Sequence, residues 1–207
     1  MNVIDKLACS LGQRSEVPNI ELAGEIVKKK DKKAVTVLIG LLSQKNKDIQ
    51  NDAVKVLYEI GETDPGLISA YLKNFLDLLD HKNNRLQWGA MTAINSIVPE
   101  DPDAVYRSLP RIIEAADKGS VITKDNAVNI LVRLGALKKY ADDSLFLLSE
   151  QLKKAFINQL PMYAERMLPL ITEKNKAAFI KILRSRIIEI EKESGRKRVE
   201  KLIKRIG

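Results

Sequence analysis

Residues 53–65 read AVKVLYEIGETDP, and residues 90–102 read AMTAINSIVPEDP, the same pattern 37 residues later. The spacing continues along the chain, because steps of 37 from the first alanine fall on Ala53, Ala90, Ala127 and Ala164. The positions four before, four after and seven after this alanine are apolar in nearly every copy. Apolar residues at i, i+4, i+8 and i+11 form one face of an α-helix. The sequence therefore predicts four copies of one amphipathic helix.

A second type of helix is predicted in front of two of these copies. Residues 67–80 and 104–117 are rich in apolar residues, and each follows an Asp-Pro pair, at 64–65 and 101–102. Asp can cap the free N–H groups at a helix start, and proline at the first helical position needs no N–H partner. A short polar turn follows each of these helices. The repeating unit is therefore predicted to be helix, short turn, helix, with a tight linker to the next unit.

These residues resemble the HEAT-repeat family, in which an apolar first helix with an internal proline is followed by an aspartate, a turn and a second helix with a fixed alanine. Pro110 matches the proline, Asp80 and Asp117 match the aspartate, and the four alanines match the fixed alanine. The resemblance covers about residues 17–194. It implies an all-α fold, a right-handed α-solenoid of stacked antiparallel helix pairs.

One position departs from the family pattern. The basic residue near the start of the second helix is Lys124 in the third copy, but Gln50 and Gln87 stand there in the two copies before it. The resemblance therefore does not by itself imply, for these two copies, the intramolecular pairing that the family builds at this position.

The ends of the chain are less regular than the middle. Gly195 is expected to end a long helix that starts after Asn175, and a helix over about 143–157 departs from the repeat spacing. The expected organisation is a single solenoid domain over 1–207, with irregular cap helices over 1–30, repeats of 37-residue period over 31–172 and C-terminal helices over 173–207.

The net charge of +8 is concentrated in two segments. Lys28–Lys33 carries five lysines and one aspartate, and Arg184–Gly207 carries nine Lys or Arg and four Glu. The rest of the chain is close to neutral, which argues against a basic face along the whole molecule. No apolar run approaches the roughly 18 residues of a membrane span, and the N-terminus lacks a signal-peptide pattern. We expect a cytoplasmic protein, and a single cysteine, Cys9, excludes an intrachain disulfide.

Polar residues on the second helices are expected to form ladders with one rung per repeat, a surface suited to a protein or peptide partner. Trp88, the only tryptophan, stands at a position that is mostly polar in the other copies and is a candidate anchor, although it could also fold over the next repeat as core. The candidate partner-binding residues are Lys55, Trp88, Thr92, Asn129, Arg133 and Arg166.

Nucleic-acid binding is the alternative function. The basic segments could neutralise phosphates, and they could equally be solvated faces. The candidate anion-binding residues are Lys28, Lys29, Lys30, Lys32, Lys33, Arg196, Lys197 and Arg198. The HEAT-like alkylpurine DNA glycosylases look similar in size, but their pattern places an Asp one turn after a cleft Trp and an Arg one repeat on. Here Thr92 and Asn129 stand at those positions, so the alternative is expected to lack that activity.

Catalytic signatures are not found in the sequence. His81 lies in a polar turn, and Cys9 is not part of a recognisable nucleophile motif. The sequence contains no CxxC, HExxH or EF-hand loop and no glycine-rich phosphate loop after a strand. We therefore expect a non-enzymatic binding scaffold without a metal or cofactor.

Overall fold

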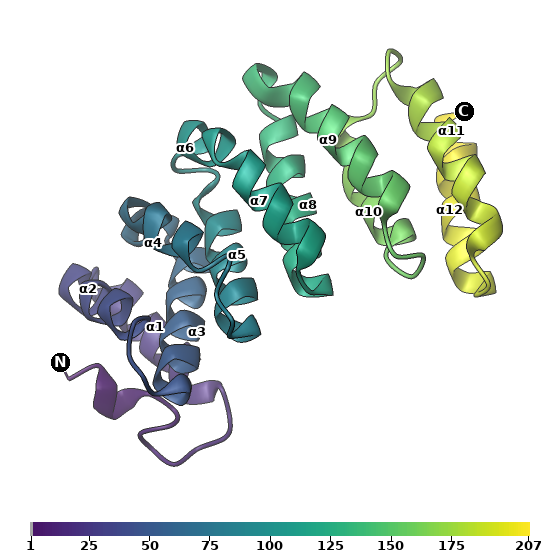
Figure 1. Ribbon diagram of the computed structural model, residues 1–207. Helices are drawn as coiled ribbons and strands as arrows, with labels where there is room; N and C mark the ends of the chain where they lie inside the picture. Colours follow the sequence, from purple (N-terminus) through teal and green to yellow (C-terminus); the bar gives the residue numbers. More distant parts are fainter. Residues whose placement is uncertain (1) are drawn as a thin grey trace. The chain divides into compact units, whose positions relative to one another are not determined.

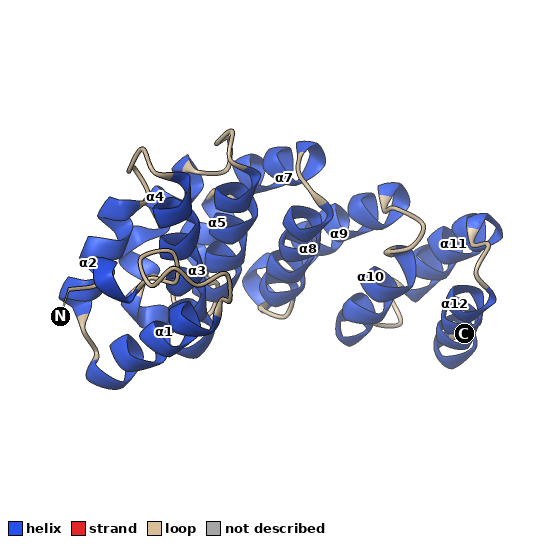
Figure 2. Ribbon diagram, turned by 90° about the horizontal axis from the view of Figure 1, so that it is seen from below, coloured by secondary structure: helices blue, strands red, loops and turns tan. Residues whose placement is uncertain are grey.

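The computed structural model describes residues 2–207 and confirms the predicted all-α solenoid (Figure 1). Along these residues the chain forms helices and loops and no strand (Figure 2). Its α-helices are Val17–Lys29 (α1), Lys32–Leu41 (α2), Lys47–Thr63 (α3), Leu72–Asp77 (α4), Asn84–Ile97 (α5), Pro102–Arg107 (α6), Leu109–Lys118 (α7), Val121–Gly135 (α8), Ala141–Lys154 (α9), Leu160–Met167 (α10), Lys176–Arg186 (α11) and Glu193–Ile206 (α12). Short 3₁₀ helices are Ile4–Lys6, Pro65–Leu67, Ser69–Tyr71, Lys138–Tyr140, Leu168–Leu170 and Ile187–Glu189.

The chain divides into two compact units, Met1–Ala127 (unit 1) and Val128–Gly207 (unit 2), and α8 belongs to both. The predicted single domain over 1–207 and its internal boundaries are not tested by this division and stay predictions.

In unit 1 the second helices of consecutive pairs lie side by side, since α3 packs against α5. The first helices α2 and α4 pack against α3 and α5 respectively, and α1 also packs against α3. Ala53 and Ala90 occupy equivalent places in α3 and α5, and both are completely buried. A methyl side chain at this place lets neighbouring helices approach closely, which explains why alanine recurs there.

Unit 2 continues the pattern of helix pairs, because α9 packs against α10 and α11 against α12. The pairs also contact each other, α9 with α11 and α10 with α12. Ala127, the last residue of unit 1 in α8, and Ala164, in α10 of unit 2, are also completely buried. The spacing of 37 residues therefore marks equivalent positions in all four copies.

The fourth copy does not keep the full apolar face that its sequence pattern predicts. Its helix α10 ends at Met167, and Leu168 and Ile171 are only half-buried. Pro169 has no N–H to donate to the carbonyl four residues earlier, and its ring would crowd that carbonyl. The helix therefore gives way to a 3₁₀ turn before the last apolar position is reached.

Some predicted helix boundaries are wrong. The predicted helix 104–117 is two helices, α6 and α7, because Pro110 cannot continue the hydrogen bonding of α6. The predicted helix 67–80 begins with 3₁₀ turns and is regular only over α4, and the predicted helix 143–157 is α9, at 141–154.

Gly195 does not end a helix, contrary to the prediction. It lies near the start of α12, and the preceding helix α11 ends earlier, at Arg186. A Cβ added at Gly195 would lie 3.1 Å from Cγ2 of the buried Ile190. The glycine therefore allows α12 to approach the chain segment that leads into it.

Candidate binding site

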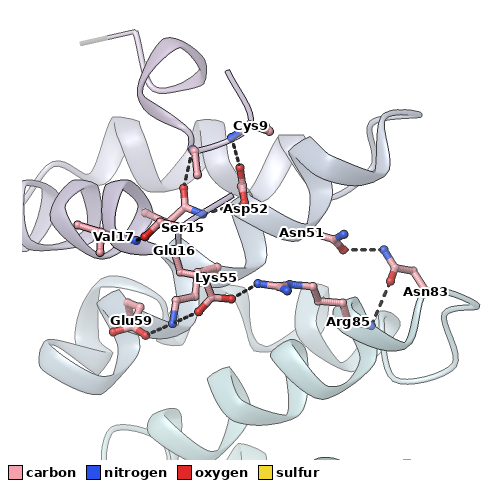
Figure 3. A network of polar contacts seen from close by, with 12 residues as sticks. Cys9, Ser15, Glu16, Val17, Asn51, Asp52, Lys55, Glu59, Asn83 and Arg85 are labelled. Carbon is pink, nitrogen blue, oxygen red and sulfur yellow. Dashed lines mark hydrogen bonds and ion pairs between the residues drawn. The ribbon is translucent and has the colours of Figure 1, made fainter. Parts of the chain in front are cut away.

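A network of charged side chains joins three helices of unit 1 (Figure 3). Glu16 precedes α1, Lys55 lies in α3 and Arg85 lies in the first turn of α5. The Glu16 carboxylate receives the Lys55 ammonium at 3.1 Å on Oε2, and Arg85 Nη2 donates to its Oε1. Lys55 also donates to Glu59 at 2.6 Å, four residues along α3. Two acids and two bases thus form one cluster of zero net charge.

The network changes the pKa values of two of its members, Glu16 and Lys55. Burial would raise the pKa of Glu16, but hydrogen bonds from Lys55 and Arg85 outweigh it and hold that pKa below its usual range. Burial would lower the pKa of Lys55, but its bonds to Glu59, Tyr58 and Glu16 raise it instead. Glu16 and Lys55 are therefore both charged at neutral pH.

Two aromatic rings lie beside these charges. The centroids of Tyr58 in α3 and Trp88 in α5 are 5.8 Å apart, with ring planes tilted by 48°. Lys55 Nζ lies 4.8 Å from the Tyr58 centroid, and the Arg85 guanidinium carbon lies 5.7 Å from the Trp88 centroid. Trp88 is half-buried, so one part of its ring packs within unit 1 and another part stays accessible. The Trp88 ring is therefore in contact with a neighbouring ring and lies close to a guanidinium.

A cleft of about 460 Å³ opens beside the network. Arg85 and Glu16 belong to its wall, so the network and the cleft share side chains. Its lining residues are Ala8, Cys9, Gly12, Gln13, Arg14, Ser15, Glu16, Asp48, Asn51, Asp52 and Arg85.

The N-terminal segment is attached to α3 by Asp52. This carboxylate accepts the Cys9 N–H and the Asn19 side-chain amide, both at 2.7 Å, and Asn19 in turn accepts the Ala8 N–H at 3.0 Å. Burial and the Asp52 carboxylate raise the pKa of the Cys9 thiol to about 11. The thiol is therefore protonated at neutral pH, a state that does not suit a nucleophile.

In unit 1, the polar side chains predicted to bind a partner make most of their hydrogen bonds and ion pairs within the molecule. Lys55 was predicted to be an accessible polar residue. Its side chain is only 8% exposed, and it is paired with two carboxylates. Thr92 donates to the Trp88 carbonyl at 2.9 Å and accepts from the Asn126 amide at 3.1 Å. Trp88 and Thr92 are both half-buried, and Trp88 is the one of the two that offers an aromatic ring to a partner.

The remaining predicted rungs belong to unit 2. Asn129 and Arg133 lie in α8, half-buried and exposed respectively, and the half-buried Arg166 lies in α10. The site around Trp88 does not include them, and their part in partner binding stays a prediction.

The predicted anion-binding residues of the first basic segment lie at the junction of α1 and α2. Lys28 and Lys29 end α1, where positive charge complements the helix dipole. Lys29 also lies 3.7 Å from Glu25, and Lys30 pairs with Asp64. Lys32 and Lys33 begin α2 and are exposed.

The predicted anion-binding residues of the second basic segment lie in α12 of unit 2. Arg196 donates to the Ile190 carbonyl at 2.9 Å, and Lys197 pairs with Glu193 at 2.6 Å. Arg198 forms a two-pronged contact with Glu165, at 2.8 and 2.5 Å. Lys29, Lys30, Lys197 and Arg198 are therefore paired with carboxylates within the chain, and anion binding by the two segments stays a prediction.

Glu16, Tyr58 and Arg85 were missed by the sequence analysis. Tyr58 and Arg85 could have been found, because they stand three residues from Lys55 and Trp88, a helical neighbour spacing. Glu16 carried no such signal, since it is 69 residues from Arg85 along the chain. Only the packing of α1 on α3 brings it to the site.

Two further observations concern the whole described chain. Among residues 2–207, no group of three or more His, Cys, Asp or Glu side chains could hold a metal ion. No helix within this range combines the length and apolar character needed to cross a membrane.

Similarity to known proteins is confined to the fold. No family model matches the sequence, and no curated protein matches it. The chain is similar to a designed armadillo repeat protein with 16% identity and a TM-score of 0.61, covering 90% of this chain and 87% of that one. It is also similar to two engineered proteins solved by a structural genomics consortium. One has 16% identity and a TM-score of 0.62, covering 100% of this chain and 99% of that one. The other has 15% identity and a TM-score of 0.56, covering 100% and 97%. At these identities the likeness shows the fold alone, a helical repeat solenoid.

Proposed function

We propose that this chain is a HEAT-like repeat protein that acts as a non-enzymatic binding scaffold in the cytoplasm. Its partner is a protein or peptide that contacts the row of second helices in unit 1. The single observation that carries the proposal is Trp88, a half-buried aromatic ring on an otherwise polar helix face, packed on Tyr58 and flanked by Arg85. Such a ring loses little conformational freedom on binding, and tryptophan and arginine are favoured at the centres of interfaces.

The surroundings of Trp88 support a macromolecular partner. The adjoining cleft is open, and its lining mixes Arg14, Gln13 and Asn51 with carboxylates, so it can offer both donors and acceptors to a peptide. The similar solved structures are described as designed or engineered proteins and are consistent with a scaffold. The Cys9 thiol, protonated at neutral pH, adds no nucleophilic chemistry to the cleft.

Capture from native lysate, followed by measurements on the purified captured protein, tests the proposal. Trp88 is the only tryptophan, so the change in its fluorescence on binding of a tryptophan-free partner peptide reports directly on the site. We expect a shift of Trp88 emission and a loss of affinity of about tenfold or more for Trp88→Ala, the cost of one hot-spot side chain. Trp88→Phe, which keeps a ring against Tyr58, should lose less.

The matched control is Phe146→Ala, because Phe146 is 67% exposed and lies in α9 of unit 2. It should leave affinity unchanged. Equal affinity for the wild type and Trp88→Ala, with no change in Trp88 emission, would show that the partner binds elsewhere.

Salt dependence separates this function from nucleic-acid binding. If the captured partner is a nucleic acid whose affinity falls steeply between ~50 and ~200 mM salt, phosphate neutralisation is the dominant interaction. Loss of that affinity on replacing Lys32 and Lys33 with Gln would then favour the basic segments over Trp88.

A further inference from the structure

The cation pair Lys55 and Arg85 is occupied by a carboxylate of the same chain. Glu16 places one oxygen against each cation, so it binds them in the way that a partner's carboxylate would (Figure 3). The Glu16 side chain remains 43% exposed, whereas that of Lys55 is only 8% exposed. The occupant is therefore accessible from the side of the cleft, as is Arg85, whereas the Lys55 ammonium is largely shielded from solvent.

Glu16 is not needed to begin its own helix. It stands at the N-cap of α1 but makes no side-chain cap hydrogen bond. The Val17 N–H donates to the Ser15 hydroxyl oxygen at 3.2 Å instead. The N-terminal segment is also held independently by Asp52 and by the Lys6–Glu25 ion pair at 2.7 Å. Displacing the Glu16 side chain therefore leaves the attachments of α1 intact.

Glu16 does not satisfy the guanidinium completely. It accepts from Nη2 of Arg85, while Nε of Arg85 is buried without a hydrogen-bond partner among the described residues. A carboxylate that lies side-on to a guanidinium accepts from two nitrogens at once, which is the preferred geometry of arginine with carboxylates. A ligand carboxylate in that orientation gains a bond that Glu16 does not make.

We propose that Lys55 and Arg85 form a carboxylate cradle for an acidic peptide partner, and that Glu16 is the displaceable intramolecular occupant of this cradle. The inference rests on the proposed function and names the chemical class of its partner. With Glu16 displaced, Lys55, Arg85 and Glu59 together carry one positive charge, which matches one acidic side chain. The Trp88 ring beside Arg85 then offers contact to an apolar neighbour of that acidic residue.

A nucleic-acid backbone fits this place less well. Nucleic acids carry a phosphate charge at every nucleotide, whereas the cleft wall next to the cradle includes the carboxylates of Asp48 and Asp52. An acidic peptide carries its carboxylates on flexible side chains, so it can place one in the cradle and turn the others away from the wall into solvent. The surroundings therefore favour an acidic peptide.

The test uses the full-length protein and a fluorescein-labelled hexaglutamate peptide at ~50 mM salt, where ion pairs are weakly screened. Glu16→Gln empties the cradle without changing the size of the side chain. We expect it to bind hexaglutamate about tenfold more tightly than the wild type. Adding Arg85→Lys, which keeps the charge but removes the planar fork, should abolish most of that gain.

The control is Glu21→Gln, which removes the same charge from an exposed position in α1. It should bind hexaglutamate as the wild type does. The proposal is overturned if Glu16→Gln binds no better than the wild type, if Glu21→Gln gains as much, or if the gain persists with Arg85→Lys. A larger gain for an oligothymidine of 20 nucleotides than for hexaglutamate would also overturn it, in favour of phosphate. Thermal melting confirms that each variant is folded.

The two proposals can fail separately. If Trp88→Ala lowers the affinity for the captured partner while Glu16→Gln leaves hexaglutamate binding unchanged, the scaffold proposal is supported and the cradle proposal is overturned. If Glu16→Gln strengthens hexaglutamate binding while Trp88→Ala leaves the affinity for the captured partner unchanged, the cradle proposal is supported and the Trp88 interface is overturned.

Discussion

Gly61 shows at the scale of one residue how closely the repeats are packed. It lies near the end of α3, where a Cβ would approach the Ser96 hydroxyl oxygen to 2.3 Å and Cδ1 of Ile68 to 2.6 Å. Ser96 and Ile68 are buried, and the Ser96 hydroxyl donates to the Ala93 carbonyl at 2.7 Å. The side chains around Gly61 therefore have little room to move away.

Gly61→Ala is expected to lower the free energy of unfolding by about 1–3 kcal/mol, because even one methyl group overpacks this contact. Gly24→Ala is the matched control, since Gly24 is exposed in α1 and nothing lies within 4 Å of its added Cβ. There the better helix propensity of alanine should raise stability by up to ~1 kcal/mol. Urea unfolding of both variants measures the difference, and effects of the same sign would contradict the packing argument.

At the scale of the element, one side chain per repeat satisfies the carbonyls at the end of the first helix. Gln50 donates to the Leu42 carbonyl at 3.1 Å and Gln87 to the Leu79 carbonyl at 2.6 Å. Lys124 donates to the Ala116 carbonyl at 2.6 Å, at the same relative position. Glutamine thus makes the same contact as lysine at this position, because an amide N–H reaches the same carbonyl as an ammonium.

In the fourth repeat, the carbonyls at the end of the first helix accept hydrogen bonds from a residue of the next helix pair. Pro161 stands at the position of Lys124 and has no donor to offer. Arg186 at the end of α11 reaches back instead and donates to the carbonyls of Leu152, Lys153 and Ala155, at 3.2, 2.6 and 3.0 Å. Its contact with Glu189, at 2.8 Å, holds the guanidinium in this orientation. An interhelix contact thus replaces one made within the repeat.

Arg186→Met is expected to destabilise unit 2 by roughly 2–3 kcal/mol, because three carbonyls at the end of α9 lose a charged donor and the side chain is mostly buried. Arg184→Met is the control, since Arg184 lies in the same helix and is exposed. It should change stability by less than ~0.5 kcal/mol. Thermal or urea unfolding of the two variants distinguishes them, and equal effects would show that the carbonyl contacts contribute little.

At the scale of the whole molecule, a repeat protein gains its stability mainly from contacts between neighbours. The helices of unit 1 pack pairwise in chain order, and so do those of unit 2. Local destabilisation is therefore expected to stay near its origin.

Hydrogen exchange followed residue by residue measures this locality. Gly61→Ala should raise amide exchange in α3 and α5 more than in α12, and Arg186→Met should show the reverse preference. A uniform rise throughout residues 2–207 in either variant would show that both units unfold as one, as the predicted single domain over 1–207 would if it were fully cooperative.

The repeat spacing and the identity of the core were readable in the sequence because both depend on local periodicity. The completely buried Ala53, Ala90, Ala127 and Ala164 follow directly from a spacing of 37 residues. The break of a predicted helix near Pro110 was less readable, because the length of each half depends on packing. Trp88 could be singled out for its chemical type, but its half-buried state could not.

What the sequence by itself determined is the class of fold, because an apolar stripe repeated at one spacing can be buried only against a neighbouring copy of itself. What only the tertiary structure decided is which polar groups are already satisfied. Lys55 and Thr92 stand in a polar column, yet both are bonded within unit 1, and Glu16 reaches Arg85 from 69 residues away. Such contacts depend on the positions of side chains from separate helices, and no local pattern encodes those distances.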